Sequence, residues 1–435
     1  MNFPIISQAL GRLRVQVATY NLQIPRKRIL IRDLPSLCFD LTMRRIFIIL
    51  GLVISVQDNS AIVSPEIKRI ITKAYGFQIM GRTGIAHLPL HGGKAPRWLF
   101  SRMTRLGREI VITIVSEFGP AELLRRLSDP FWFQALGCVL GFDWHSSGVT
   151  TTVCGALKEG TKGLEKELGV IFAGGKGGIS RRTPEEILKA AERFGFDPAP
   201  LIYASRMAAK VDNNALQDGY QLYHHTFVFT HKGEWSVIQQ GMNEINSMAR
   251  RYHWLGEKIE KFVVEPHAAI CAEQKTAPLN LVARESEANR QASTALGREK
   301  PETLLKELQR IQQLELPRRH PVQIEDINPQ RLEKIFLKIY ERQPADFETL
   351  LGLSGVGPKT IRALSLIAEL IYGAEPSFRD PARFSFAHGG KDGHPYPVDR
   401  ANYDRSIMIL ERAIKQAKLG QREQLEALRR LSQWL

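Results

Sequence analysis

Apolar and polar positions alternate most clearly between residues 220 and 239. Residues 220–230 are rich in aromatic and β-branched side chains, which is typical of a strand. The polar segment 231–234 predicts a turn, and residues 235–239 predict the partner strand of a β-hairpin. Period-two geometry places His225, Phe227 and Phe229 on one face and His224, Thr226, Val228 and Thr230 on the other.

A helical spacing of apolar residues dominates most of the remaining chain after residue 96. We expect helices at 97–118, 120–127, 183–194, 242–256, 301–316, 330–342, 346–353, 358–371 and 403–435. Residues 272–300 are polar and hold few large apolar side chains after Val282, so they predict a linker or a loose helix.

These elements predict an α+β fold. We expect a mixed α/β body with a β-hairpin at 80–270, a linker at 271–300 and a mainly helical domain at 301–400. Residues 401–435 form a C-terminal helix in this interpretation, with Leu425, Leu428, Leu431 and Trp434 recurring on one side. That side can pack on the body, or on a second copy of the chain to make a homodimer.

Charge separates the first 79 residues from the others. Residues 1–79 hold 11 Lys and Arg against 4 Asp and Glu, so they carry +7 of the net charge of +15, and the remaining 356 residues carry +8. We interpret 1–79 as a basic extension that is disordered or precedes the natural start at Met80. The alternative is a basic arm that helps to hold nucleic acid.

The four cysteines, Cys38, Cys138, Cys154 and Cys271, form no C-x-x-C pair. They therefore indicate neither a disulfide framework nor a zinc or iron–sulfur site, and they fit a reducing cytoplasm. The longest apolar run, residues 46–56, is too short to span a bilayer, so we expect no membrane partner. The glycine segment 172–178 lacks a Walker A sequence, so no nucleotide cofactor is indicated; it predicts a phosphate-contacting loop or a plain connector.

A glycine hairpin stands between two apolar helical patterns at Leu353–Thr360. Gly355 and Gly357 allow positive φ and close approach of a ligand, and Pro358 suits the first position of a helix. The free N–H groups at that helix start form an anion site, to which Lys359 adds a charge.

The sequence L-S-G-V-G-P-K-T and its flanking helices resemble the helix-hairpin-helix motif of DNA-repair and DNA-processing proteins, over about residues 345–373. This resemblance implies a DNA partner that is held by its phosphate backbone without reading of sequence. The implied DNA-binding residues are Gly355, Val356, Gly357, Lys359 and Thr360. An ordinary αα-corner with a glycine turn is the alternative.

Lys359 and Asp399 are similar in position to the catalytic lysine and aspartate of helix-hairpin-helix DNA glycosylases. The resemblance implies a lysine nucleophile that forms a Schiff base with the sugar, and an aspartate that stabilises the sugar cation. The 40 residues between the two, and the absence of the histidine of the V-D-T-H segment and of the iron–sulfur cysteines, depart from that pattern.

A metal-dependent nuclease site is the second catalytic hypothesis. Acidic and histidine side chains near strand ends can hold Mg²⁺ or Mn²⁺, which activates water for phosphodiester cleavage. The candidate catalytic residues are Asp143, His145, Asp218 and Glu234, and the candidate metal ligands are Asp218, Glu234, Glu265 and His267. A third polar cluster, His388, Asp392, His394 and Asp399, lies within the glycine-rich segment 386–400, which can bind a metal or phosphate or simply cap the helical domain.

Several sequence blocks resemble the DUF763 family, an uncharacterised set of archaeal and bacterial proteins. They are 80–99, 142–151, 217–220, 235–242 and 386–400, so the likeness covers about residues 80–410. The family name implies no settled activity. We therefore expect a sequence-tolerant DNA-binding protein, with a metal-dependent nuclease favoured over a DNA glycosylase, and a non-catalytic module that recognises DNA structure as the further alternative. RNA is a weaker candidate partner.

Overall fold

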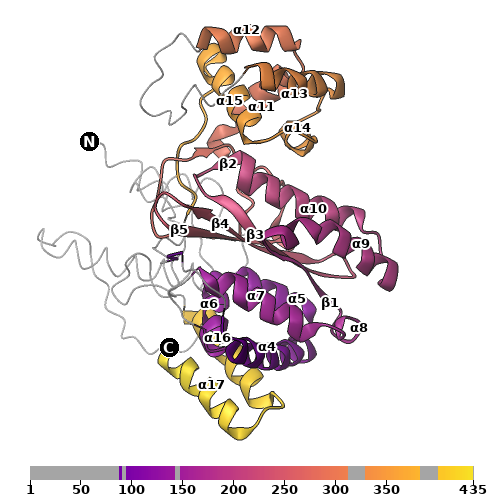
Figure 1. The fold of residues 1–435 in the computed structure, drawn as a ribbon, viewed down its shortest axis with the longest axis vertical. Coiled ribbons are helices and arrows are strands. Elements are labelled where there is room, and N and C mark those ends of the chain that lie inside the picture. The colour runs from indigo at the N-terminus through magenta and orange to yellow at the C-terminus, as the bar shows by residue number, and fades with distance from the viewer. Residues whose placement is uncertain (1–87, 91–94, 143–146, 312–328, 383–399, 435) are drawn as a thin grey trace, which may run out of the picture. The chain divides into compact units, whose positions relative to one another are not determined.

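The computed structural model describes residues 88–90, 95–142, 147–311, 329–382 and 400–434. These residues belong to one compact unit, which extends from Met80 to Leu435. Its architecture is mixed α+β, as predicted, and helices cover both faces of an antiparallel sheet (Figure 1). Within the described residues, no helix combines the length and the apolarity that a membrane crossing requires.

The larger sheet has the strand order β1-β3-β4-β5-β6, and every neighbouring pair is antiparallel. Its strands are β1 (Val170–Lys176), β3 (Gln221–Thr230), β4 (Trp235–Asn243), β5 (Met248–Leu255) and β6 (Ala269–Cys271). A two-stranded sheet pairs β2 (Leu216–Gln217) with β7 (Leu279–Asn280). The hairpin predicted at 220–239 is confirmed as β3 and β4.

Both faces of the sheet are buried, which explains the many large side chains on its strands. Phe227 and Phe229 pack into one hydrophobic cluster, and Val228 packs into the other on the opposite face. This division confirms the two faces that the period-two pattern predicted for β3. Because each strand is covered twice, polar residues on it must find partners inside the protein.

The layer on the Val228 face joins the first helices of the described chain to its last ones. The helices are α4 (Arg97–Phe118), α5 (Pro120–Ser128), α6 (Pro130–Val139), α7 (Gly148–Thr161), the short α8 (Glu165–Leu168), α16 (Arg400–Gln416) and α17 (Gln421–Trp434). They share one cluster with Val228 and Ile238, whose members include Ile110, Trp132 and Leu410. Asp129 caps α6 by accepting hydrogen bonds from the backbone N–H groups of Phe131 and Trp132.

The Phe227 face of the sheet is covered by α9 (Thr183–Phe194) and α10 (Ala199–Lys210). A helical group beyond them packs against α10 and the segment 211–215 (Figure 1); it consists of α11 (Glu287–Gly297), α12 (Pro301–Ile311), α13 (Pro329–Arg342), α14 (Phe347–Gly352) and α15 (Pro358–Tyr372). One apolar cluster contains Phe227 of the sheet together with Phe336, Leu350 and Leu364 of these helices. The regions 80–270 and 301–400 thus share a core.

The predicted C-terminal helix is two helices, because the segment 417–420 separates α16 from α17. Ala427 and Leu431 of α17 are buried in the cluster of α4 and α6, whereas Leu425 is 60% exposed. The apolar side of this region therefore packs on the body of its own chain, which was one of the two arrangements expected from its sequence.

The helix expected at 242–256 is wrong, because Met248–Leu255 is the strand β5. Tyr252 and Trp254 point to the Phe227 face, and Ala249 and Leu255 do not share it. The alternation was hidden by Arg250 and Arg251, which look like surface residues in a sequence but are both fully buried here. A strand covered on both faces lacks the apolar and polar alternation of a half-exposed strand.

The second half of the segment 271–300, expected to be a linker or a loose helix, is helical. Residues 287–297 form α11, which packs against α15, and its polar residues Asn289, Arg290 and Ser293 are buried. Arg290 donates to the carbonyl oxygens of Leu281 and Ala283 at 2.6 and 2.7 Å, and Asn289 donates to those of Ser365 and Ala374. The polar side chains of α11 therefore donate hydrogen bonds to buried backbone carbonyl groups and do not face solvent.

The glycine segment 172–178 belongs to the sheet as far as Lys176. Gly174 has φ +82°, and an added Cβ would meet the carbonyl oxygen of His225, so the position requires glycine. Its N–H donates to Glu186 at 2.8 Å, and its carbonyl accepts from Lys158 at 2.8 Å. Both backbone groups of Gly174 are therefore engaged inside the protein, which favours the connector over the phosphate loop. Glu186 consequently faces the sheet, and α9 begins without a side-chain cap.

Candidate functional site

A tight turn between α14 and α15 presents the candidate site. Asp346 caps α14 by accepting from the N–H of Thr349 at 2.7 Å, and this bond lowers the pKa of the Asp346 carboxyl. Gly355 has φ +91° in the turn, with no atom within 4 Å of the position where a Cβ would stand. Gly357 precedes the first turn of α15, and Pro358 occupies its first position. The sequence thus sets a sharp turn directly before a positive helix end.

The side chains of the turn divide into exposed and buried sets. Ser354, Gly355 and Lys359 are exposed, while Val356 and Thr360 retain only 4% and 1% of their accessible surface. Val356 and Thr360 can therefore meet a ligand only through their backbone groups, and Lys359 supplies the exposed charge of the turn. A partner would meet chiefly main chain here.

Lys210, the last residue of α10, lies beneath this turn. Its ammonium donates to the carbonyl oxygen of Leu351 at 2.7 Å, to that of Leu353 at 2.6 Å and to that of Val356 at 3.4 Å. Burial lowers the pKa of Lys210. The three contacts place a positive charge against the carbonyl oxygens of the turn and offset their partial negative charge.

Two further side chains from the segment after Lys210 attach the turn to the core. Asn214 donates to the carbonyl of Val356 at 3.4 Å, and Gln217 donates to that of Pro358 at 2.9 Å. Gln217 in turn accepts from Arg362 of α15 at 2.7 Å. The turn is consequently fixed at three of its backbone carbonyls and at its second helix, which pre-organises its N–H groups.

The segment Val211–Ala215, which contains Asn214 and lies between Lys210 and Gln217, is a π-helical turn, a conformation that often marks a functional position. It also directs Asp212 into the core, where the carboxylate accepts from Gln239 at 2.6 Å and from Trp254 at 2.9 Å and contacts His267. Burial raises the pKa of Asp212, and His267 opposes this effect. The same short segment therefore joins the sheet to the turn.

A buried hydrogen-bond chain continues from Asp212 through Gln239 to His225. Because the amide NH₂ of Gln239 faces Asp212, its oxygen faces His225 Nδ1 at 2.9 Å, so Nδ1 carries the proton. His225 Nε2 then accepts from the hydroxyl of Ser205 at 2.9 Å. Burial lowers the pKa of His225 to about 4. Ser205 and His225 have the order of a nucleophile and its base, but both are buried, so the chain acts as structure.

Asp218, a predicted catalytic and metal-binding residue, lies in a buried ion-pair cluster. Its carboxylate accepts from Arg250 at 2.9 Å and from Tyr252 at 2.7 Å, and Arg250 also donates to Asp380 at 2.7 Å. Burial lowers the pKa of Arg250, but the two carboxylates outweigh this and raise it. The counter-ion of Asp218 in this structure is therefore Arg250.

The four predicted metal ligands are not brought together. Glu234 accepts from Thr230 beside the hairpin turn, and Glu265 pairs with Arg284 at 3.0 Å. His267 contacts Asp212, and Asp218 contacts Arg250. No group of three or more His, Cys, Asp or Glu side chains suited to a metal ion occurs among the residues that the structure describes. Asp143, His145, His388, Asp392, His394 and Asp399 lie outside those residues.

The opposite face of the sheet carries a second polar cluster. Gln240 contacts Thr150 and Tyr223 and donates to the carbonyl of Ser147 at 2.9 Å. The backbone N–H of Ser147 donates to Pro89 at 3.1 Å, and Pro89 pairs with Met248. Segments 88–90, 147–151 and 239–242, which lie far apart in the chain, therefore meet at one end of β4. They come from the blocks that carry the family resemblance.

Sequence inspection missed three residues: Lys210, Asp212 and Asp380. Lys210 contacts the turn, Asp212 begins the hydrogen-bond chain to His225, and Asp380 pairs with Arg250. The run Lys210-Val211-Asp212-Asn213-Asn214 at the end of a helical pattern was a usable signal, because four polar residues there exceed what a helix end needs. No comparable signal marks Asp380, whose partner Arg250 is 130 residues away.

A five-stranded antiparallel sheet with helical layers on both faces defines the class as a mixed α+β protein. Residues 84–398 match a protein family described as "Protein of unknown function (DUF763)", and the chain belongs to that family. No curated protein matches the chain. No solved structure matches it either.

Proposed function

We propose that this protein binds DNA through the phosphate backbone, with Leu353–Thr360 as the principal contact. The arrangement of Lys210 carries this proposal. Its partly buried ammonium offsets the partial negative charge of three carbonyl oxygens, so that the positive end of α15 attracts an anion.

Sequence-tolerant binding follows from the chemistry of the turn. Backbone N–H groups and one exposed lysine recognise phosphate, and neither reads the edges of bases. Two glycines allow a phosphate to approach the main chain closely, since no side chain stands in front of it. The resemblance of this segment to helix-hairpin-helix motifs points the same way, as does the net charge of +8 on the 356 residues from Met80 onward.

Binding should weaken steeply with salt, because each neutralised phosphate releases counterions. The test is fluorescence anisotropy of a labelled duplex and of a labelled single strand across a salt series. Unrelated sequences should bind with similar affinity. Failure of the full chain to bind either DNA at low salt would overturn the proposal.

The same preparation separates the catalytic alternatives. Cleavage that requires Mg²⁺ or Mn²⁺ and stops with EDTA would make the protein a nuclease. A covalent adduct with abasic DNA, trapped by borohydride and lost in Lys359→Arg, would make it a glycosylase or lyase. Binding with neither activity on a panel of DNA structures would leave the non-catalytic module.

A further inference from the structure

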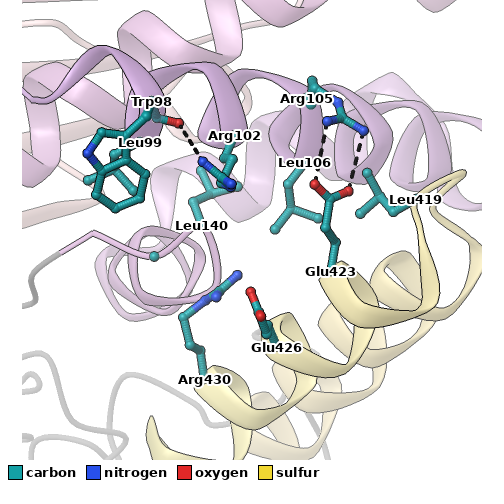
Figure 2. Close-up of a pocket in the computed structure, with 11 residues that line it drawn as sticks. Trp98, Leu99, Arg102, Arg105, Leu106, Leu140, Leu419, Glu423, Glu426 and Arg430 are labelled. Atoms are coloured by element: carbon teal, nitrogen blue, oxygen red, sulfur yellow. Dashed lines mark hydrogen bonds and ion pairs between the residues drawn. The ribbon is translucent and has the colours of Figure 1, made fainter.

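A cavity of about 520 Å³ lies between α4 and α17, beside the residues that follow α6 (Figure 2). Its volume falls in the range of small-molecule sites. Leu99, Leu106, Leu140 and Leu419 provide apolar lining, and Arg102, Arg105 and Arg430 provide charge. An apolar base with a few convergent charges is the usual composition of a ligand site.

The charges of this cavity do not cancel within it. Arg105 is paired with Glu423 through two contacts of 3.4 Å, and Glu426 is paired with Arg422 at 3.2 Å, outside the cavity lining. Arg102 and Arg430 have no carboxylate within ion-pair distance among the described residues. Two guanidinium groups therefore remain for an external anion.

A hydrogen bond to the last residue of α6 fixes the position of Arg430. Its Nε donates to the carbonyl of Val139 at 2.9 Å, which fixes the guanidinium plane. Burial lowers the pKa of Arg430, and the charge of Glu426 opposes this effect, so a further anion beside Arg430 would stabilise the guanidinium electrostatically. Figure 2 shows Arg430 of α17 and Arg102 of α4 directed into the same opening from its two walls. A planar fork on each wall suits the oxygens of a phosphate or carboxylate.

Trp98 forms part of the rim, and 61% of its surface is exposed. The Arg102 guanidinium stands 5.5 Å from its ring centroid. An exposed indole beside the leucine side chains of the cavity offers a stacking surface to a flat ring. Glu426 adds an acceptor at the same opening, which can receive a hydrogen bond from a ligand hydroxyl.

We infer that this cavity binds a nucleoside phosphate. The phosphate lies between Arg102 and Arg430, a sugar hydroxyl donates to Glu426, and the base covers Trp98 and the leucines. This chemistry occurs in free mononucleotides and at the 5′-phosphorylated end of a nucleic acid strand. The inference does not depend on the Leu353–Thr360 turn, which lies on other helices.

Calorimetric titration of the full chain tests it, with four nucleoside monophosphates, inorganic phosphate and an aromatic carboxylate as probes. A nucleoside monophosphate should bind more tightly than the other two. A 5′-phosphorylated oligonucleotide and its 5′-hydroxyl counterpart distinguish the two sources of the ligand. The oligonucleotide measurements use Gly357→Ala protein, in which binding at the turn is weakened, and the difference between the 5′-phosphorylated and 5′-hydroxyl oligonucleotides is the quantity compared.

Arg102→Met and Arg430→Met should each weaken nucleotide binding at least about tenfold, since each loses a charge-assisted contact. Arg429→Met, on the exposed side of the same helix, should leave it unchanged. Arg102 is exposed, so its variant stays folded even if Arg430→Met does not. Absence of binding by every nucleoside monophosphate at millimolar concentration, or binding that Arg102→Met leaves intact, would overturn the inference.

Discussion

The ammonium of Lys210 lies 2.6 Å from the carbonyl oxygen of Leu353, although 143 residues separate the two in the chain. This contact connects the sheet layer to the turn Leu353–Thr360. Together with the bond to Leu351 it places a fixed positive charge under a segment that otherwise exposes glycines and main chain. Removing it should therefore affect both the stability of the protein and the binding of an anion.

We expect Lys210→Met to lower the free energy of unfolding by about 1–3 kcal/mol, because it removes the donor to the partly buried carbonyl oxygens of Leu351 and Leu353. DNA affinity should fall as well, since the carbonyl dipoles then oppose the anion. Urea unfolding and anisotropy measure the two effects. Lys189→Met, at an exposed position of α9, serves as the control. Unchanged DNA affinity in folded Lys210→Met protein would disconnect this lysine from the site.

Gly355→Ala and Gly357→Ala separate backbone strain from phosphate contact. Gly355 has φ +91°, so alanine there should cost about 1 kcal/mol of stability. Gly357 has extended backbone with φ −122° and open space around its Cβ position, so alanine should cost little. Both variants should weaken DNA binding, because the added methyl group stands where a phosphate would approach. Thermal unfolding of each variant measures the loss of stability, so a loss of DNA affinity without a loss of stability is assigned to the phosphate contact.

Acid should destabilise the protein through its buried histidines. Burial lowers the pKa of His225 to about 4 and that of His224 to about 3, from about 6.5. Below pH about 6.5 these histidines bind a proton in the unfolded chain but stay neutral in the folded protein. The free energy of unfolding therefore falls as the pH falls from about 6.5 toward 4.

His225→Gln should reduce this slope by up to about 1.4 kcal/mol per pH unit in that window. His231→Gln, in the exposed turn of the hairpin, is the control. Asp212 and Asp218 have raised pKa values and contribute with the opposite sign, so the comparison is between variant and parent. If stability depended on pH equally in His225→Gln and in the parent, the buried, neutral state of His225 would be contradicted.

The ion-pair cluster around Arg250 should be a major contributor to stability. Asp380→Asn leaves a fully buried guanidinium with one carboxylate instead of two, and breaking a buried pair costs about 3–5 kcal/mol. Asp404→Asn, at an exposed position of α16, should cost far less. Denaturant midpoints of the two variants check this. A loss in Asp380→Asn no larger than in Asp404→Asn would show that the cluster does not hold the fold.

Local patterns predicted the elements whose environment is local. The β3–β4 hairpin and α15 could be identified because alternation, a proline at a first helical position and a terminal glycine act within a few residues. Arg250 and Arg251 misled the interpretation of β5, because a buried arginine and a surface arginine look alike until Asp218 and Asp380 are seen beside the first.

The candidate site could be predicted for the same reason only in part. Gly355, Gly357 and Lys359 define a turn by themselves. Lys210 contacts this turn only through the tertiary fold, and no spacing in the sequence predicts that contact. The metal hypothesis grouped Glu234, Glu265 and His267 as acidic and histidine side chains near strand ends, whereas each has a different partner in the structure.

The central claim is that the turn Leu353–Thr360 holds DNA phosphate, and the salt dependence of DNA affinity in Lys359→Ala tests it most directly. We predict weaker binding to every duplex sequence and a slope of log affinity against log salt that is smaller by about one. Lys166→Ala, at an exposed position of α8, should behave like the parent. Parent-like affinity and slope in Lys359→Ala would contradict the account.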